Sequence, residues 1–434
     1  MRILVLGAGV VGTTAAWYLA RSGHEVAVLE RQGAAGLETS FANGGQISAS
    51  NAAPWANPDA PAKILQWLGR PDAPLRFRPR ADWRQWAWGA RFLWECLPGR
   101  TRANTRHLLA LARYSREALR ELRRETGIAY DQLARGILHF YTDEAEFERA
   151  AADARRARAE GADCELKSAA ECIAIEPALR HAAERIHGGV FLPADESGDA
   201  LKFTQALASL AATTAGVRFL FGRSIKRLDA GAGRVRGVVL ADAAGGDETI
   251  AADAYVVALG SYSPLLLRPI GVSLPVYPLK GYSVTLPLAP GAEAPTVSLT
   301  DEAHKLVFSR LGERLRVAGT AELSGYNTDL DELRCEAILR RTLEIFPGAG
   351  GAGPAQYWTG LRPATPSNVP CIGRTRYPNL FVDTGHGTLG WTLACGSARA
   401  LADLVAGRRP EPDFPFLGVP RGARAVLVPR ASAG

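Results

Sequence analysis

The chain has 434 residues, 47% of them hydrophobic, which is enough to bury a substantial core and predicts two or three domain-sized bodies. The formal net charge of +7 is spread thinly, without a block of Lys or Arg that resembles a nucleic-acid-binding arm, so we expect no nucleic-acid partner. The six cysteines and seven histidines show neither disulfide nor metal-ligand spacing, which predicts no metal site and favours a reducing, cytoplasmic compartment.

The first elements are predicted as a strand, a helix and a second strand over residues 2–30. No charged residue occurs from Ile3 to Ala20, a stretch that by hydropathy alone resembles a signal peptide or a membrane span. Glycines interrupt this stretch where a strand would turn into a helix, and a second strand-like run follows at 25–29. The pattern therefore predicts a βαβ unit rather than a membrane segment.

Residues 7–12 carry the pattern Gly-x-Gly-x-x-Gly between the first strand and the helix. Gly7 permits the tight turn, Gly9 lets the backbone approach a pyrophosphate, and Gly12 allows the helix to pack closely on the strand. Glu30 ends the second strand, where a carboxylate can accept hydrogen bonds from ribose hydroxyls and disfavours the 2′-phosphate of NADP. These features predict an adenine dinucleotide site, with an unrelated glycine-rich turn as the alternative. The residues expected there are Ile3, Leu4, Val5, Leu6, Gly7, Ala8, Gly9, Val10, Val11, Gly12, Glu30 and Arg31.

The rest of the chain alternates between strand and helix patterns. The elements expected in order are a loop-rich segment 31–62, basic helices within 63–126, a strand 137–141, a helix 144–158, a return to strands and a helix from about 186, a strand ending at Gly260, antiparallel strands at 281–286, 305–308 and 315–319, a helix 329–346, a loop 347–354, a strand 379–383 and a helix near 389–406.

This order predicts an α/β fold in which two domains are threaded through each other. We expect a Rossmann-type FAD-binding domain interleaved with an α+β substrate domain that carries an antiparallel sheet. The expected boundaries are 1–75, 186–265 and 355–434 for the FAD-binding domain, and 76–185 and 266–354 for the substrate domain.

The glycine pattern does not separate FAD from NAD, so the prediction of FAD rests on three further segments. Residues 38–47 form a polar, glycine-bearing loop, a second strand stops at Gly260, and residues 379–391 read as strand, glycine loop and helix. Reduced flavin carries negative charge near N1 and the C2 oxygen, which a helix N-terminus stabilises, whereas NAD has no such need. The residues expected to contact FAD are Ser40, Asn43, Gly45, Gln46, Gly260, Gly385, His386, Gly387, Thr388, Leu389 and Gly390; for His386 a packed structural histidine is the preferred interpretation.

With these segments in hand, the chain resembles the D-amino-acid oxidase superfamily and, within it, the bacterial D-amino-acid dehydrogenases. The resemblance extends from 7–12 to 383–392 and includes 53–55, 276–283 and 358–366. It implies a β-sheet roof over the flavin and oxidative deamination of D-amino acids to 2-oxo acids and ammonia by hydride transfer to flavin N5. It also implies a quinone or other non-oxygen electron acceptor, and peripheral association with the cytoplasmic face of the inner membrane. Nothing is carried over to the tail beyond about 415.

Arg362 is the expected carboxylate clamp, because residues 360–363 resemble the superfamily segment that places an arginine over the flavin and a guanidinium matches a carboxylate bidentately. The alternative is a surface arginine paired with an acid. Tyr282 is the second catalytic candidate, with core packing as an equal alternative, and neighbouring Lys280 is expected to be a solvated charge. The tryptophans of 83–94 are expected to pack, with an amphipathic surface for a membrane or an electron acceptor as the alternative.

Three rival functions remain open. The first is an oxygen-using D-amino-acid or glycine oxidase, and the second is a secondary-amine dehydrogenase acting on D-proline or sarcosine. The third belongs to a different class, a flavin-free dinucleotide-binding regulatory protein.

Overall fold

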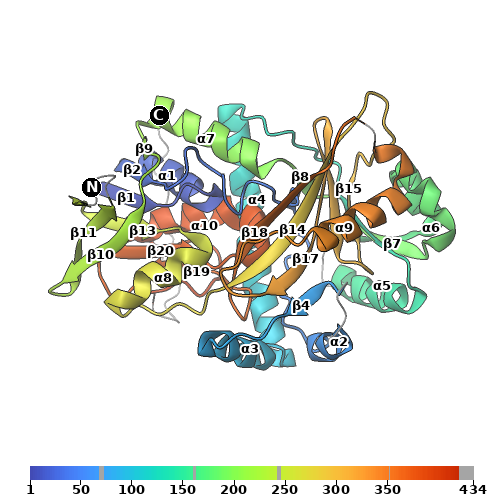
Figure 1. The fold of residues 1–434 in the computed structure, drawn as a ribbon, viewed down its shortest axis with the longest axis horizontal. Coiled ribbons are helices and arrows are strands. Elements are labelled where there is room, and N and C mark those ends of the chain that lie inside the picture. The colour runs from blue at the N-terminus through green and yellow to red at the C-terminus, as the bar shows by residue number, and fades with distance from the viewer. Residues whose placement is uncertain (68–72, 160–162, 242–245, 351, 420–434) are drawn as a thin grey trace.

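The computed structural model describes residues 1–67, 73–159, 163–241, 246–350 and 352–419, which form two large sheets with helices around them (Figure 1). The chain passes between the two sheets several times, so segments distant in sequence lie side by side in each of them. The fold is α/β, with one mainly parallel sheet and one mainly antiparallel sheet.

The first sheet has six strands in the order β19-β20-β13-β1-β2-β9. All its pairings are parallel except that of β19, which runs antiparallel at the edge. The strands are apolar on both faces, as expected of a parallel sheet covered on both sides. Their bounds are β1 Arg2–Leu6, β2 Glu25–Leu29, β9 Arg218–Leu220, β13 Ala254–Val257, β19 Cys371–Arg374 and β20 Leu380–Thr384.

Different elements cover the two faces of this sheet. Side chains alternate along a strand, so Ile3 and Val5 of β1 pack with helices on one face, whereas Leu4 and Leu6 pack with a three-stranded sheet on the other. The helices are α1 Val10–Arg21, α4 Pro98–Thr126, α7 Ala200–Ala215 and α10 Gly390–Val405; the three strands are β10 Ile225–Gly231, β11 Arg234–Ala241 and β12 Asp247–Ile250.

The second sheet has nine strands, eight of them in the order β18-β14-β17-β16-β15-β5-β7-β6, while β4 pairs with β17. One face packs against α9 Glu332–Ile345 and forms a separate core. The strand bounds are β4 Leu75–Phe77, β5 Ile137–Tyr141, β6 Glu165–Ser168, β7 Gly188–Leu192, β14 Tyr277–Pro287, β15 Ser298–Asp301, β16 Leu306–Leu311, β17 Arg314–Leu323 and β18 Gln356–Ala364.

Shorter elements surround the two sheets, and Figure 1 shows α2 and α3 together on one side of the molecule. The bounds of the remaining elements are α2 Ala60–Trp67, α3 Trp83–Glu95, α5 Glu144–Ala159, α6 Ala169–Ile175, α8 Ser263–Leu267, the strand pair β3 Gln46–Ile47 and β8 Glu196–Ser197, and the 3-10 helices η1 Pro177–Arg185, η2 Gly260–Tyr262, η3 Arg268–Ile270, η4 Pro347–Ala349 and η5 Gly387–Leu389.

The predicted βαβ unit is confirmed as β1, α1 and β2, and across the described residues no helix has the length and apolarity that a membrane span requires. The strands expected at 281–286, 305–308 and 315–319 lie in β14, β16 and β17, with antiparallel pairing. Strand β18 was not expected, because Gly360 and Pro363 interrupt its apolar pattern.

The domain boundaries expected from the sequence stay a prediction. The six strands of the first sheet do come from the three segments assigned to the FAD-binding domain. Two strands from those same segments, β7 and β18, pair instead within the nine-stranded sheet. Residues 68–72, 160–162, 242–245, 351 and 420–434 of the two expected domains lie outside the described residues.

Candidate functional site

A cavity that is partly open to solvent lies between the turn after β1 and the strands β14 and β18. Its wall combines residues near both ends of the chain, since Gly7 and Gly9 line it together with the segment 386–388. The FAD prediction requires the first and the last glycine turns to lie near each other. Both turns line this one cavity, as required.

The turn after β1 is built for close approach. Gly7 has a φ of +103°, and a Cβ there would lie 2.7 Å from the carbonyl oxygen of Ala258. A Cβ on Gly12 would overlap the carbonyl oxygen of Gly7. Helix α1 has no acidic residue in its first turn, and its N-cap residue, Gly9, makes no side-chain cap. Apart from the N–H of Val10, which donates to Ser40, its N-terminus therefore leaves backbone N–H groups for an anion.

Glu30 lies at the cavity end of β2. Its Oε2 accepts from the backbone N–H of Ala8 at 2.8 Å and its Oε1 accepts from that of Gln32 at 2.9 Å. Next to it, Arg31 donates to Glu38 Oε1 at 2.5 Å and lies 4.2 Å from the ring centroid of Tyr262. The hydrogen bond that Arg31 donates to Glu38 raises the pKa of Arg31 above its ordinary value.

The turn after β20 closes another side of the cavity. Gly385 and Gly387 both have positive φ, and α10 begins at Gly390 without a side-chain cap or an acidic residue in its first turn. A second uncapped helix N-terminus therefore starts at the cavity wall, since Gly390 lines it. Such a terminus stabilises negative charge, and a reduced flavin carries negative charge.

Two buried ionisable side chains support this turn. His386 is 2% exposed and its Nε2 lies 2.9 Å from Ser397 Oγ. Asp383 is 1% exposed, and neither of its carboxyl oxygens has a hydrogen-bond partner among the described residues. Burial lowers the pKa of His386 to about 3 and raises the pKa of Asp383 well above its ordinary value. The imidazole of His386 is therefore neutral near pH 7, and its Nε2 lies 3.4 Å from Asp383 Oδ1.

Thirteen of the residues expected at the cofactor line the cavity: Gly7, Gly9, Val10, Val11, Glu30, Arg31, Ser40, Asn43, Gly260, His386, Gly387, Thr388 and Gly390. Ser40 also fixes the first turn of α1, because its Oγ accepts from the N–H of Val10 at 3.0 Å. The others lie behind the wall: Ile3, Leu4, Val5 and Leu6 are buried within the sheet, and Ala8, Gly12, Gly45, Gln46, Gly385 and Leu389 support the loops.

These residues fit FAD. The cavity offers a close backbone approach at one end, a carboxylate suited to ribose hydroxyls beside it, and an uncapped helix N-terminus at a second place. Two anion-attracting termini in one cavity match a long cofactor that carries negative charge at its pyrophosphate and at its reduced ring.

Arg362 lines the same cavity from β18. Its Nη1 donates to the carbonyl oxygen of Thr320 at 3.0 Å, and within the described parts of the chain no carboxylate forms an ion pair with it. Burial lowers the pKa of Arg362 to about 10, so the guanidinium stays charged near neutral pH. The alternative of a surface arginine paired with an acid does not describe this side chain.

The structure does not bring Tyr282 together with Arg362. Directly opposite residues of β14 and β18 share a face, which puts Gly281 and Arg362 on one face of the sheet and the ring of Tyr282 on the other. Although Tyr282 contributes to the cavity wall, it is 1% exposed, its ring belongs to the core beneath α9, and its hydroxyl donates to Glu322 Oε2 at 3.1 Å. This is the packing alternative considered from the sequence.

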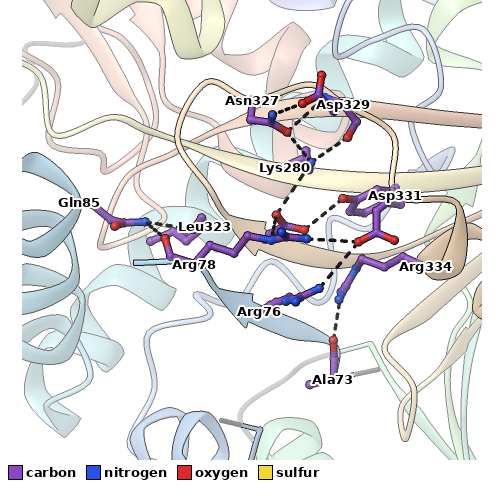
Figure 2. Close-up of polar contacts among 12 residues, drawn as sticks. Ala73, Arg76, Arg78, Gln85, Lys280, Leu323, Asn327, Asp329, Asp331 and Arg334 are labelled. Atoms are coloured by element: carbon purple, nitrogen blue, oxygen red, sulfur yellow. Dashed lines mark hydrogen bonds and ion pairs between the residues drawn. The ribbon is translucent and has the colours of Figure 1, made fainter. Parts of the chain in front are cut away.

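Lys280 is not a solvated charge, contrary to the sequence-based expectation. It is 2% exposed and donates to Asn327 Oδ1 and to the carbonyl oxygen of Asp329, both at 2.9 Å (Figure 2). Its Nζ also lies 3.9 Å from Glu322, which in turn pairs with Arg78 at 2.6 Å. Burial lowers the pKa of Lys280. No pattern in the sequence predicts this network, because its members come from separate segments.

The tryptophans of α3 are also more exposed than expected. Trp88 packs, donating to the carbonyl oxygen of Ala364 at 2.9 Å. Trp83, Trp86 and Trp94 are instead between 54% and 70% exposed. Leu93 and Leu97 are also exposed. Packing, the preferred interpretation, is therefore wrong for most of the cluster.

Several residues that line the cavity were not predicted from the sequence. Arg223 and Lys226 reach the cavity from the start of β10, and no motif marks them. Trp358 and Gly360 lie in the segment that carried the family resemblance, and this was the available signal.

Comparison with known proteins identifies the family. A family model described as FAD dependent oxidoreductase matches residues 2–404. A D-amino acid dehydrogenase of Dechloromonas aromatica is 60% identical over 417 residues, covering 96% of this chain and all of that protein. A D-amino acid dehydrogenase of Paramagnetospirillum magneticum is 53% identical, covering 97% of this chain and 99% of that protein.

Solved structures share the fold at lower identity. Glycine oxidase from Bacillus cereus superimposes with a TM-score of 0.71 at 23% identity, covering 95% of this chain and 98% of that one. L-proline dehydrogenase from P. horikoshii gives 0.70 at 18% identity, with 94% of each chain covered.

Proposed function

The chain belongs to the FAD-dependent oxidoreductase family whose model spans residues 2–404, and from this membership we propose that it oxidises D-amino acids as an FAD-dependent dehydrogenase. Relatives at 53% and 60% identity over nearly the full length carry that name. The observation that carries the proposal is the charged guanidinium of Arg362 in the cofactor cavity without a carboxylate partner among the described residues.

Arg362 binds the substrate carboxylate in this proposal. A guanidinium and a carboxylate form two parallel hydrogen bonds, which fix the direction of the α-carbon as well as its place. FAD, when bound, accepts the hydride that leaves the α-carbon. Positioning supplies most of the rate, because a held substrate reacts as an intramolecular partner.

The other wall residues hold the cofactor. The N-terminus of α1 binds the pyrophosphate, Glu30 accepts from the ribose, and the N-terminus of α10 stabilises negative charge at the ring. His386 adds no positive charge beneath that terminus, because burial lowers its pKa to about 3. The oxidised product is an imino acid, which water converts to the 2-oxo acid and ammonia.

The decisive experiment is anaerobic. The purified yellow holoenzyme is mixed with a panel of D- and L-amino acids, together with sarcosine and D-proline, and the flavin absorbance is followed. Bleaching by D-amino acids such as D-alanine, and not by their L-enantiomers, is the expected result. Selective bleaching by sarcosine or D-proline favours a secondary-amine dehydrogenase, and a colourless protein would overturn the proposal.

The electron acceptor is proposed to be a quinone or another acceptor that is not oxygen. Aerobic turnover with D-alanine should then release little hydrogen peroxide, while an added quinone analogue sustains turnover. Stoichiometric peroxide would identify an oxidase instead, the activity named for the glycine oxidase that shares this fold.

We also propose that α3 attaches the protein to the cytoplasmic face of the inner membrane. The exposed surface formed by Trp83, Trp86, Leu93 and Trp94 of α3, together with Leu97 just before α4, is apolar. Basic side chains lie beside it: Arg84 is 5.3 Å from the ring centroid of Trp83 and Arg100 is 4.0 Å from that of Trp94. Aromatic rings flanked by arginines suit the interface of an anionic bilayer, from which a quinone would also be supplied.

A further inference from the structure

The guanidinium of Arg362 rests on the α-carbon of Gly281. Arg362 lies opposite Leu279 in the pairing of β18 with β14, and Gly281 is the next residue of β14 on the same face. A Cβ built on Gly281 would overlap Cζ, Nη1 and Nη2 of Arg362 almost equally, so this α-carbon faces the guanidinium plane. Gly281 does not have a positive φ, so its lack of a side chain provides space rather than conformational freedom.

Thr320 meets the same guanidinium from β17. The pairing of β14 with β17 passes from Gly281–Ala321 to Tyr282–Gly319, which leaves Thr320 as the extra residue of a β-bulge. Thr320 has a φ of +51°, a left-handed conformation that threonine rarely adopts. The bulge aims its carbonyl oxygen at Arg362 Nη1, 3.0 Å away.

The side chain of Thr320 does not explain this conformation. Its Oγ1 is buried and forms no hydrogen bond with any described residue. A strained backbone and an unpartnered hydroxyl persist only where the surrounding structure compensates, and such residues cluster at functional sites. The contact that compensates the strain at Thr320 is the hydrogen bond that its carbonyl accepts from Arg362.

We infer that Gly281 and Thr320 are positioning residues that fix the orientation in which Arg362 receives the substrate carboxylate. Gly281 sets the plane of the guanidinium and the Thr320 carbonyl sets its rotation within that plane. One donor is thereby occupied, and the remaining N–H groups stay available for a bidentate carboxylate. The inference rests on the proposed function, since it assigns Arg362 the role of carboxylate clamp.

The test measures carboxylate binding apart from turnover. Propionate, a carboxylate without an amine, is titrated into the oxidised holoenzyme, and its dissociation constant is read from the change in flavin absorbance. Gly281→Ala should weaken propionate binding at least about tenfold, the loss expected when a charge-assisted hydrogen bond is displaced. The KM for D-alanine should rise in parallel.

Gly319→Ala is the matched control. A Cβ on Gly319 would overlap the side chain of Leu306, so the variant crowds the same sheet at a residue that faces the core instead of Arg362. Propionate binding should then stay within about twofold of the wild type. An equal loss in both variants would show a general distortion of the sheet and would overturn the inference.

A double-mutant cycle separates positioning from any independent effect. In an Arg362→Ala background, Gly281→Ala should have no further effect on propionate binding, because the group it displaces is gone. An additional tenfold loss there would overturn the inference. If D-alanine bleaches the flavin of the wild-type enzyme but Gly281→Ala binds propionate normally, the inference is overturned and the proposed function stands. A wild type that responds to neither ligand overturns the proposed function and the inference with it.

Discussion

The carboxylate of Glu30 accepts a hydrogen bond from the backbone N–H of Ala8 at 2.8 Å, which ties the end of β2 to the turn after β1. Through this bond one side chain organises the glycine turn and presents an acceptor to the cavity. The two roles are separable, because the first acts on the protein alone and the second only on a bound ribose.

Glu30→Ala should weaken FAD binding about 10- to 100-fold, since a charge-assisted hydrogen bond contributes about 1.5–3 kcal/mol. The measurement is a fluorescence titration of the apoprotein with FAD. Glu25→Ala, at the exposed start of the same strand, should bind FAD as the wild type does. Equal affinities for Glu30→Ala and the wild type would remove Glu30 from the ribose site.

Tyr282→Phe should lower the free energy of unfolding by about 1 kcal/mol and leave kcat and KM for D-alanine close to the wild type. The reason is that the Tyr282 hydroxyl bonds to Glu322 on the face of the sheet away from Arg362. Chemical denaturation and steady-state kinetics check the two halves of the prediction. A loss of kcat above about tenfold would indicate that the phenol of Tyr282 contacts the substrate.

Glu322→Gln should be far more damaging, with a loss of about 3–5 kcal/mol in unfolding free energy. Glu322 is 1% exposed and pairs with Lys280, which is 2% exposed, so its neutralisation leaves this buried ammonium without its carboxylate partner, whereas Arg78 is 42% exposed and keeps Asp331. A companion Lys280→Met change should recover part of the loss. Denaturation curves for the two single variants and the double variant measure the coupling; strict additivity would argue against a shared network.

Asp383→Asn should stabilise the holoenzyme at pH 7–8, and the gain should fade as the pH falls toward 4. The folded-state pKa of Asp383 lies above its unfolded value, so the folded protein retains a proton that the unfolded chain releases. Stability is therefore lost as the pH rises from the unfolded pKa through the folded one, and the amide removes this loss. Melting temperatures across the pH range, with FAD in excess, provide the check; a gain independent of pH would contradict the assignment.

A Trp83→Ser, Trp86→Ser double variant should lose binding to vesicles that contain anionic lipid, while its melting temperature changes little. These side chains are 70% and 54% exposed, so their removal creates no cavity. Cosedimentation at low salt measures the binding. Leu333→Ser is the control, because Leu333 is 76% exposed but lies on α9. Wild-type protein that stays in the supernatant would defeat the membrane proposal.

The sequence predicts the cofactor half of this protein well, for a physical reason. Gly7, Gly9 and Gly12 act through backbone geometry, so their spacing alone encodes the turn. The turn at 385–390 also follows directly from a strand, a pair of glycines and a helix. The strands β14, β16 and β17 were predicted in place, because apolar runs bounded by turn residues determine them locally, whereas β18 was not predicted.

The substrate side was harder to predict, because pairing across strands decides it. Whether Tyr282 faces the cavity or the core depends on the register of β14 with β18, which a single strand does not encode. Lys280 was expected to be a solvated charge, because its partners Asn327 and Asp329 lie in a loop about fifty residues later. The bulge at Thr320 follows Gly319, but a glycine within a strand does not reveal which carbonyl a bulge redirects, so the bond to Arg362 was not predicted.

The strand order of the six-stranded sheet bears on how the protein is made. Strand β13 gains its second neighbour only when β20, Leu380–Thr384, has left the ribosome. Until then a nascent chain of more than three hundred residues carries an open apolar strand edge, which is a template for wrong pairing. A chain that ends before β20 therefore lacks both this strand and the cavity wall that follows it at 386–388.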